Sequence, residues 1–459
     1  MERKNAWKSY DKYELMRLEA FSKDYCRFLD NGKTERECVA FCIEEAKAKG
    51  YMDMDACIAE GKKISAGDKV YVNWMDKVFM LFVMGKQPLE KGMRILGAHI
   101  DSPRIDVKQN PLYEDSDLAY LDTHYYGGLK KYQWVATPLS LHGVIVKKSG
   151  ERVNVCIGED ESDPVFCISD LLPHLAAEQM KKDGANLFNG EELDLIIAGQ
   201  PLEGEEKEAV KANVLKILAD RYNVEEEDFL SAELEIVPAG KARDMGLDRS
   251  MILAYGHDDR VCSYPSMRAV MDFDGVPETT LCCVLVDKEE IGSVGATGMN
   301  SCFFENTIAE LCALAGDTSA LTVRRALRNS AMLSSDVSAG FDPSFASAFE
   351  KKNAAFLGRG LCFNKYTGSR GKGGSSDANA EYMADIRRMM DDAGVFFQTA
   401  ELGRVDLGGG GTIAYMCAKY GMNVIDAGVA VLSMHAPYEV ISKADLYEAY
   451  KGYCAFLKG

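Results

Sequence analysis

The stretch LCCVLVDKEEIGSVG, residues 281–295, joins an uncharged segment directly to a charged one. Leu281 to Val286 carry no charge and suit the middle of a protein, whereas two adjacent glutamates follow within four residues. Glu289 and Glu290 would repel each other if both were ionised side by side in a dry environment. We therefore expect that they lie in water or beside a positive group.

Other apolar segments of the chain also end in polar residues. They run over 94–98, 251–256, 331–335 and 428–434, and they lead to His99, to His257-Asp258-Asp259-Arg260, to Asp336 and to His435. Helical patterns fit between them at residues 261–273, 380–394 and 411–421. Strands that alternate with helices predict an α/β fold, with a mixed, mostly parallel sheet covered by helices on both faces.

Residues from about 103 to about 232 differ in character from the rest. Alternating segments at 136–146 and 151–158 flank Lys148-Ser149-Gly150, which fits a hairpin turn. The chain is also longer than one hydrophobic core usually supports. We predict one discontinuous α/β domain, residues 1–103 and 233–459, interrupted by a β-rich insert, residues 104–232.

The charge balance restricts the class of partner. The chain has 53 basic and 71 acidic residues, a formal net charge of −18. Nucleic acids and anionic membrane surfaces attract basic proteins, so we expect neither as a partner. The first residues contain no apolar core of a secretion signal, and no run is long enough to cross a bilayer. The 14 cysteines lie mostly in apolar segments without a CxxC pair, so we expect reduced thiols in a cytoplasmic protein.

The polar residues at the strand ends predict a metal site. In sheets of this kind, ligands bind beyond the carboxyl ends of the strands. Five such ends would bring too many negative groups into one crevice without a cation. Two divalent metal ions would supply the positive charge that these groups need. We expect Asp258 to bridge the two ions, with His99 and Asp336 on one of them and Glu290 and His435 on the other.

Two further carboxylates have roles beside the metals in this hypothesis. Glu289 remains outside the ligand set and next to it, where a carboxylate can take a proton from the attacking water as a general base. Asp101, two residues after His99, can accept the second ring N–H of that imidazole and fix its tautomer. One glutamate would then bind metal while its neighbour moves the proton.

Each of these features has a simpler explanation when taken alone. A Glu-Glu pair often begins a solvated helix, Asp336 could be a helix N-cap, and His435 could be a partly buried histidine. Their joint occurrence at successive strand ends favours a two-metal hydrolase. A phosphate loop is absent from the glycine-rich residues 367–376, and no GxSxG nucleophile motif occurs in the chain. The four glycines at 408–411 fit a hinge or an anion-binding turn equally well.

Five motifs, in order along the chain, resemble the aspartyl aminopeptidase (aminopeptidase I) family of metallopeptidases. They are GAHIDSPRID (97–106), HDDR (257–260), DKEEIGS (287–293), SSD (334–336) and SMHAPYE (433–439). THYYGGLKKYQW (123–134), DPVFCISDLLPHL (163–175) and KYTGSRGKGG (365–374) are similar to bacterial members of that family. The resemblance covers nearly the whole chain.

The resemblance implies a metal-dependent aminopeptidase that removes N-terminal residues from peptides. It also implies two divalent metal ions per chain, Zn²⁺ first with Co²⁺ or Mn²⁺ as alternatives. The insert would be a dimerisation domain, and the dimers would form a tetrahedral dodecamer around a chamber. Carried over by position, the metal ligands fall on His99, Asp258, Glu290, Asp336 and His435, and the catalytic base falls on Glu289. His174, in the insert, resembles a histidine that completes a neighbouring subunit's site, and Lys365 resembles a substrate-binding lysine.

One departure concerns specificity. Members specific for acidic residues carry histidines soon after the SxD aspartate, and residues 338–342 contain none. The resemblance therefore does not imply a preference for N-terminal Asp or Glu. Two alternatives remain, a non-catalytic assembly protein with the same fold and a related two-metal amidohydrolase. The complete set of ligands and base disfavours the first, and the motifs in the insert disfavour the second.

Overall fold

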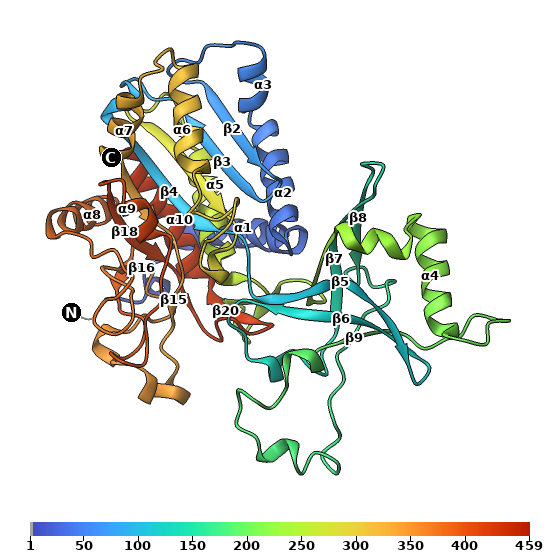
Figure 1. Cartoon of the computed structure of the whole chain (residues 1–459). Helices are drawn as coiled ribbons and strands as arrows, with labels where there is room; N and C mark the ends of the chain where they lie inside the picture. Colours follow the sequence, from blue (N-terminus) through green and yellow to red (C-terminus); the bar gives the residue numbers. More distant parts are fainter. Residues whose placement is uncertain (1–2) are drawn as a thin grey trace. The chain divides into compact units, whose positions relative to one another are not determined.

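The computed structural model describes residues 3–459, and the chain divides into two compact units. The first unit comprises residues up to 101, residues 242–434 and residues 439–459. The second unit comprises residues 102–241 and 435–438. Figure 1 shows the path of the chain through both.

A nine-stranded mixed sheet forms the centre of the first unit. Its strands are, in spatial order, β1 (Met52–Asp53), β2 (Lys69–Trp74), β3 (Val78–Val83), β13 (Thr280–Val286), β4 (Met93–His99), β14 (Ala331–Ser334), β18 (Asn423–Gly428), β16 (Leu361–Asn364) and β17 (Phe397–Thr399). The four strands from β13 to β18 are mutually parallel. Antiparallel pairs flank them, so the sheet is mixed and mostly parallel as the sequence predicts.

The uncharged run that opens the charged stretch is β13, and both of its faces are covered. Cys283 and Leu285 belong to one hydrophobic cluster, whereas Cys282 and Val284 belong to the cluster on the opposite face. Successive side chains of a strand point to opposite faces, so a strand with helices on both sides needs apolar residues throughout. This explains why the segment shows no polar alternation.

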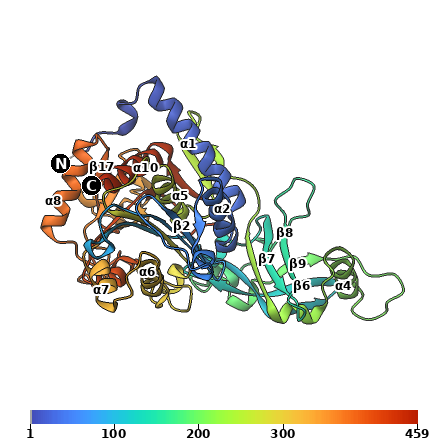
Figure 2. The same cartoon turned by 90° about the horizontal axis from the view of Figure 1, so that it is seen from above.

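Two sets of helices cover the two faces (Figure 2). One face packs against α1 (Lys12–Asn31), α2 (Glu35–Ala48), α5 (His257–Met271), α8 (Ala380–Asp392) and α10 (Lys443–Lys458). The other packs against α3 (Met54–Ala59), α6 (Phe303–Leu314), α7 (Ala320–Arg328) and α9 (Ala414–Ala418).

Two apolar segments that the sequence suggested for the same sheet lie outside it. The segment before His257 is β12 (Met251–Ala254), which pairs antiparallel with β11 (Arg243–Met245) and β20 (Glu439–Ser442) in a separate sheet. The segment before His435 contains β19 (Ala430–Val431), which pairs only with β15 (Ser338–Ala339) among the described residues. Hydrophobicity identifies such strands, but pairing between distant segments decides their sheet.

The second unit is built on a six-stranded antiparallel sheet. In spatial order its strands are β8 (Arg152–Ile157), β7 (Leu139–Val146), β10 (Ala232–Pro238), β5 (Arg104–Asp115), β6 (Leu118–Tyr126) and β9 (Leu195–Ala198), and α4 (Ala209–Tyr222) belongs to the same unit. Because β10 pairs with β7 and β5, this unit continues to Lys241 rather than ending at residue 232. The turn after β7 contains Gly150 at a φ of 87°, a left-handed conformation that glycine adopts without strain.

Among residues 3–459, no helix combines the length and the apolar composition that crossing a membrane requires.

Candidate metal centre

Adjacent parallel strands bring the first candidate ligands to one edge of the large sheet. β4 ends at His99, which lies opposite Val286, the last residue of β13. β14 ends two residues before Asp336. His99 is 2% exposed, so its ring is removed from bulk water.

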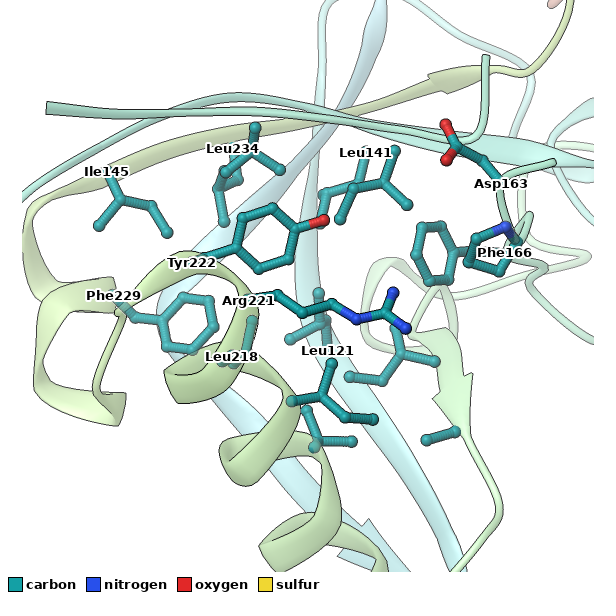
Figure 3. Close-up of a pocket in the computed structure, with 17 residues that line it drawn as sticks. Leu121, Leu141, Ile145, Asp163, Phe166, Leu218, Arg221, Tyr222, Phe229 and Leu234 are labelled. Atoms are coloured by element: carbon teal, nitrogen blue, oxygen red, sulfur yellow. The ribbon is translucent and has the colours of Figure 1, made fainter. Parts of the chain in front are cut away.

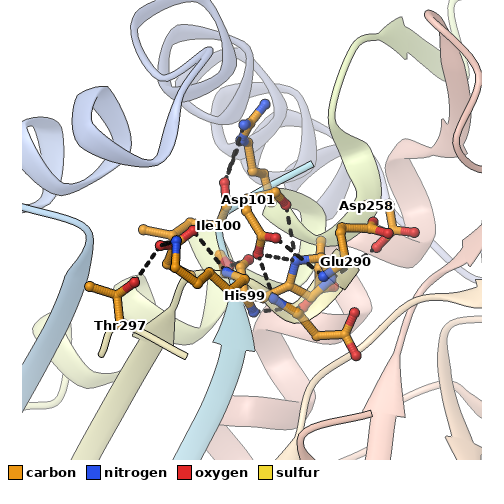
Figure 4. Close-up of polar contacts among 12 residues, drawn as sticks. His99, Ile100, Asp101, Asp258, Glu290 and Thr297 are labelled. Atoms are coloured by element: carbon orange, nitrogen blue, oxygen red, sulfur yellow. Dashed lines mark hydrogen bonds and ion pairs between the residues drawn. The ribbon is translucent and has the colours of Figure 1, made fainter. Parts of the chain in front are cut away.

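The two ring nitrogens of His99 have different neighbours. Nδ1 lies 3.0 Å from the main-chain oxygen of Asp101 and 3.2 Å from its Oδ1. Nε2 lies 3.2 Å from Asp258 Oδ1. With its proton on Nδ1, the ring donates to Asp101 and presents the Nε2 lone pair on the side of Asp258 (Figure 4). This is the orientation that a carboxylate partner imposes on a metal-binding histidine.

Asp101 also holds the two glutamates that follow β13. Its Oδ1 accepts the main-chain N–H of Glu289 at 3.1 Å, and its Oδ2 accepts that of Glu290 at 3.2 Å. Asp101 is fully buried. One carboxylate thus fixes both the imidazole and the start of the Glu-Glu segment, whereas the sequence indicated only its contact with the histidine.

The start of α5 presents three consecutive side chains to different surroundings. His257 lies 2.8 Å from the Tyr25 hydroxyl, and burial lowers its pKa to about 3. Asp258 lies beside His99, and its main-chain N–H donates to Glu439 Oε2 at 2.9 Å. Asp259 Oδ2 accepts the main-chain N–H of His99 at 3.3 Å, and the peptide bond between the two aspartates is cis.

The candidate ligand atoms form three overlapping groups. Within each group, one ligand atom per residue lies within 4.8 Å of the others. The groups are His99 with Asp258 and Glu290, His99 with Glu289 and Asp336, and Asp258 with Asp259 and Asp336. Because they share members, the six residues form one continuous centre.

The electrostatics of this centre suit a cation. Burial, together with the negative charges of Glu289 and Asp259, raises the pKa of Asp336 well above its ordinary value. Burial works to lower the pKa of His99, but hydrogen bonds to Asp101 and Asp258 raise it well above the usual range. Imidazole and carboxylate donors at this spacing fit divalent zinc, which takes both ligand types.

Besides Asp101, which contacts the centre as described, three predicted site residues lie outside the three groups. His435 belongs to the second unit, and its Nδ1 lies 2.7 Å from the main-chain oxygen of Gly128. His174 is exposed in a turn of the second unit. Lys365 follows β16 in the first unit, and its ammonium donates to Asp377 at 2.6 Å. The contact of Lys365 with the metal centre remains a prediction.

Two residues with contacts at this centre were given no role from the sequence. Asp259 shares a ligand group with Asp258 and Asp336, and Glu439 accepts the Asp258 N–H. Both lie inside the quoted motifs HDDR and SMHAPYE. The motifs mark both residues as candidates for the site, but the spacing of the motifs does not indicate which partners these carboxylates contact.

The α/β sheet and the donor set at its carboxyl edge define the class of metal-dependent hydrolases. Residues 28–457 match the family model described as aminopeptidase I zinc metalloprotease (M18). The chain belongs to this family, and it is therefore an enzyme of the metallopeptidase class.

Individual relatives agree with this assignment. A curated protein of Clostridium acetobutylicum named "Probable M18 family aminopeptidase 1" is 57% identical over 99% of this chain and 98% of its own length. The crystal structure of an M18 family aminopeptidase from Thermotoga maritima is 43% identical, with a TM-score of 0.94 over 100% of this chain and 99% of that one. A Saccharomyces cerevisiae structure, the mApe1 dodecamer, shares the fold at 20% identity and a TM-score of 0.78, over 96% and 97% of the two chains.

Proposed function

We propose that this chain releases N-terminal residues from peptides by metal-dependent hydrolysis at the centre around His99. The observation that carries the proposal is the continuous set of one imidazole and five carboxylates at the carboxyl edge of a mostly parallel sheet. Membership of the M18 family supports peptides as the substrate class.

The proposed ligands are His99, Asp258, Glu290, Asp336 and His435, and Asp258 bridges two ions. Asp258 shares one ligand group with Glu290 and another with Asp336, the proposed carboxylate ligands of the two different ions, which supports the bridging role. For His435, support comes from the contact of Nδ1 with the Gly128 main-chain oxygen, the kind of partner that orients a histidine binding metal through its other ring nitrogen. Zinc is the expected ion, with Co²⁺ or Mn²⁺ as alternatives.

Bound divalent ions supply Lewis-acid activation of a water molecule and of the scissile carbonyl. Glu289 accepts the proton of the attacking water and delivers it to the leaving amine. Asp101 keeps His99 in one tautomer and holds the main chain of Glu289, so that the base does not move away during the proton transfer. Lys365 binds the substrate in this proposal.

The proposal includes no preference for an N-terminal Asp or Glu. Residues 338–342, Ser-Ala-Gly-Phe-Asp, contain no histidine to meet a negatively charged substrate side chain.

The active form is proposed to be a homo-oligomer built from dimers, in which His174 completes the site of a neighbouring subunit. Apolar side chains flank His174 in its exposed turn: Leu171 is 51% exposed, Leu172 50% and Leu175 68%. Such a patch suits contact with another protein surface. The fold shared with the mApe1 dodecamer supports a tetrahedral dodecamer as the final assembly.

The protein is proposed to work in the cytoplasm, without nucleic-acid or membrane partners. Its cysteines form no disulfide within residues 3–459, and most of them are buried. Buried thiols of this kind persist in a reducing compartment.

One experiment tests the activity. Elemental analysis of the purified protein should find two divalent ions per chain, and incubation with tripeptides of varied first residue should release free amino acids. The same peptides with an acetylated N-terminus should stay intact. Equal cleavage of acetylated peptides would favour the amidohydrolase alternative, and absence of both metal and cleavage would favour the assembly protein.

A further inference from the structure

We propose that the second unit contains a binding site for a free apolar amino acid. The site is a cavity of about 340 Å³ between α4 and the six-stranded sheet, drawn in Figure 3. Every residue that lines it belongs to the second unit, and none of them is among the residues proposed for the metal centre.

The walls of the cavity are apolar and come from separate elements. The sheet contributes Leu121, Leu141 and Leu234, which are at most 8% exposed. Val214 of α4 and Phe229 after it close the other side and are also buried. Because these buried side chains belong to packed elements, the walls that they form are part of the fold.

The size and the lining indicate a small ligand with an apolar body. Small-molecule pockets measure roughly 300–1,000 Å³ and are lined mainly by apolar side chains, so this cavity is at the small end. A water molecule is poorly stabilised in such a cavity, because apolar walls offer too few hydrogen-bond partners. A whole amino acid with a side chain of the leucine or methionine kind fits within this volume and suits the apolar lining.

Two opposite charges among the lining residues define the polar end of the ligand. Arg221 lies in the last turn of α4, and Figure 3 shows its side chain extending across the cavity toward the segment of Asp163 and Phe166. Lys211 and Lys216 of the same helix are engaged by Glu226 and Asp220, whereas Arg221 forms no ion pair within the described part of the chain. A guanidinium in this position suits a carboxylate, which it can bind through two N–H groups.

Asp163 supplies the complementary charge. Its Oδ2 accepts the main-chain N–H of Gly158 at 3.2 Å and of Asp160 at 3.4 Å, which holds the side chain in place. A carboxylate fixed in this way suits an ammonium group. A ligand with an apolar side chain, a carboxylate for Arg221 and an ammonium for Asp163 is a free amino acid.

The location can be tested by crystallography with L-selenomethionine as the probe. Crystals of the metal-loaded protein soaked with it should show an anomalous selenium peak among Leu141, Val214 and Phe229. This peak supports the proposal whether or not a second one lies at the metal centre. Selenium only at the metal centre, or at neither place, would overturn it.

The recognition can be tested by calorimetry with L-leucine. Leu218→Trp should remove the binding because the larger indole occupies space that the ligand's side chain needs, and Arg221→Gln should weaken it at least about tenfold through loss of a charged hydrogen-bond donor. Lys216→Gln, on the same helix outside the cavity, is the matched control and should bind as the parent does. Circular dichroism establishes that each variant is folded, and Leu218→Phe replaces Leu218→Trp if the latter is not.

Analogues of leucine distinguish the amino acid from a simple apolar acid. 4-Methylpentanoate lacks the ammonium group and 3-methylbutylamine lacks the carboxylate, so each should bind at least about tenfold more weakly than leucine. Equal binding of 4-methylpentanoate would show a site for apolar acids and overturn the amino-acid assignment. Unchanged leucine binding in Leu218→Trp and Arg221→Gln would place the ligand elsewhere.

Discussion

One buried carboxylate, Asp101, determines how Glu289 and Glu290 are presented. Its two oxygens accept the main-chain N–H groups of Glu289 and Glu290, and the same carboxylate accepts the Nδ1–H of His99. Adjacent residues in an extended segment would point to opposite sides, but here both main-chain N–H groups face one anion. Glu289 and Glu290 therefore enter two different ligand groups of the same centre.

Replacement of Glu289 by Gln should separate proton transfer from metal binding. Because Glu289 is proposed to be the base and no ligand, we expect metal content near that of the parent and a kcat at least about a hundredfold lower. Glu290→Gln is the matched control one residue away, and it should lose metal. Loss of both ions in Glu289→Gln, measured by elemental analysis, would identify Glu289 as a ligand instead.

Replacement of Asp101 by Asn should weaken the centre without removing a ligand. The amide has one acceptor oxygen where the carboxylate has two, so at least one of the three N–H groups would face an NH₂ group. We expect a fall of about 10- to 100-fold in metal affinity or activity, the usual effect of losing the partner of a ligand. Competition with a chelator measures the affinity, and unchanged values would contradict the positioning role.

Replacement of Asp258 by Ala should be worse than any change in a ligand to a single ion. A shared carboxylate contributes to both sites, so its loss should depress the occupancy of both. Asp336→Ala is the comparison, and it should retain more metal. Two ions per chain in Asp258→Ala would rule out the bridge.

At the scale of elements, hydrophobic patterning predicted the strands that form the central sheet but could not predict all of their pairings. The segments at 94–98 and 281–286 lie within β4 and β13, because strands covered on both faces are mostly apolar. By contrast, β12 is apolar too, yet it pairs with β11 and β20 in a separate sheet. Pairing between residues 251–254 and 439–442 is non-local, and no short-range pattern encodes it.

The glycine-rich stretch before α9 shows another limit of patterning. The helix predicted over 411–421 extends only over Ala414–Ala418. Thr412 holds the preceding turn instead, since its hydroxyl donates to Asp426 at 2.7 Å and accepts the main-chain N–H of Ala414 at 3.3 Å. Glycines lose more conformational entropy in a helix than other residues, so the helix begins only after them.

The end of β18 approaches the segment of Asp336, which gives a prediction at this scale. A Cβ at Gly428 would lie 1.8 Å from the main-chain oxygen of Asp336, far inside van der Waals contact. Gly428→Ala should therefore displace Asp336, lower metal content and destabilise the fold. Gly410→Ala is the control, because nothing lies within 4 Å of its Cβ position. Equal metal content and melting temperature in the two variants would show that the strand moves without disturbing the ligand.

At the scale of the whole molecule, the sequence placed the centre at the strand ends but not the contributions of distant segments. His99, Asp258, Glu290 and Asp336 lie together because each follows a strand or begins a helix in the first unit. His435 and His174 belong to the second unit, and their distance from each ligand depends on how units and subunits assemble. The assembly of units and subunits depends on the shape and chemistry of their contact surfaces. Neither hydrophobic periodicity nor motif spacing predicts these surfaces.

His174 is proposed to act at a site shared between subunits. His174 is exposed in a turn of the second unit, remote in sequence from every metal-ligand segment. An imidazole from another subunit could donate to the substrate carbonyl as negative charge builds on it, and removing one such donor costs about 100- to 1,000-fold in kcat. We expect His174→Ala to lose activity on this scale while it keeps its metals and its oligomeric state.

Mixing two inactive variants decides whether the contribution is made between subunits. A hybrid dimer of His174→Ala and Glu289→Gln contains one intact site, formed by Glu289 of the first chain and His174 of the second. Random exchange between equal amounts should restore about a quarter of the parent activity, since half of the dimers are hybrids with one working site of two. Each variant exchanged with itself is the control and should stay inactive. No recovery despite exchange shown by mass spectrometry of differently tagged chains, or full activity of isolated monomers, would place His174 outside the chemistry.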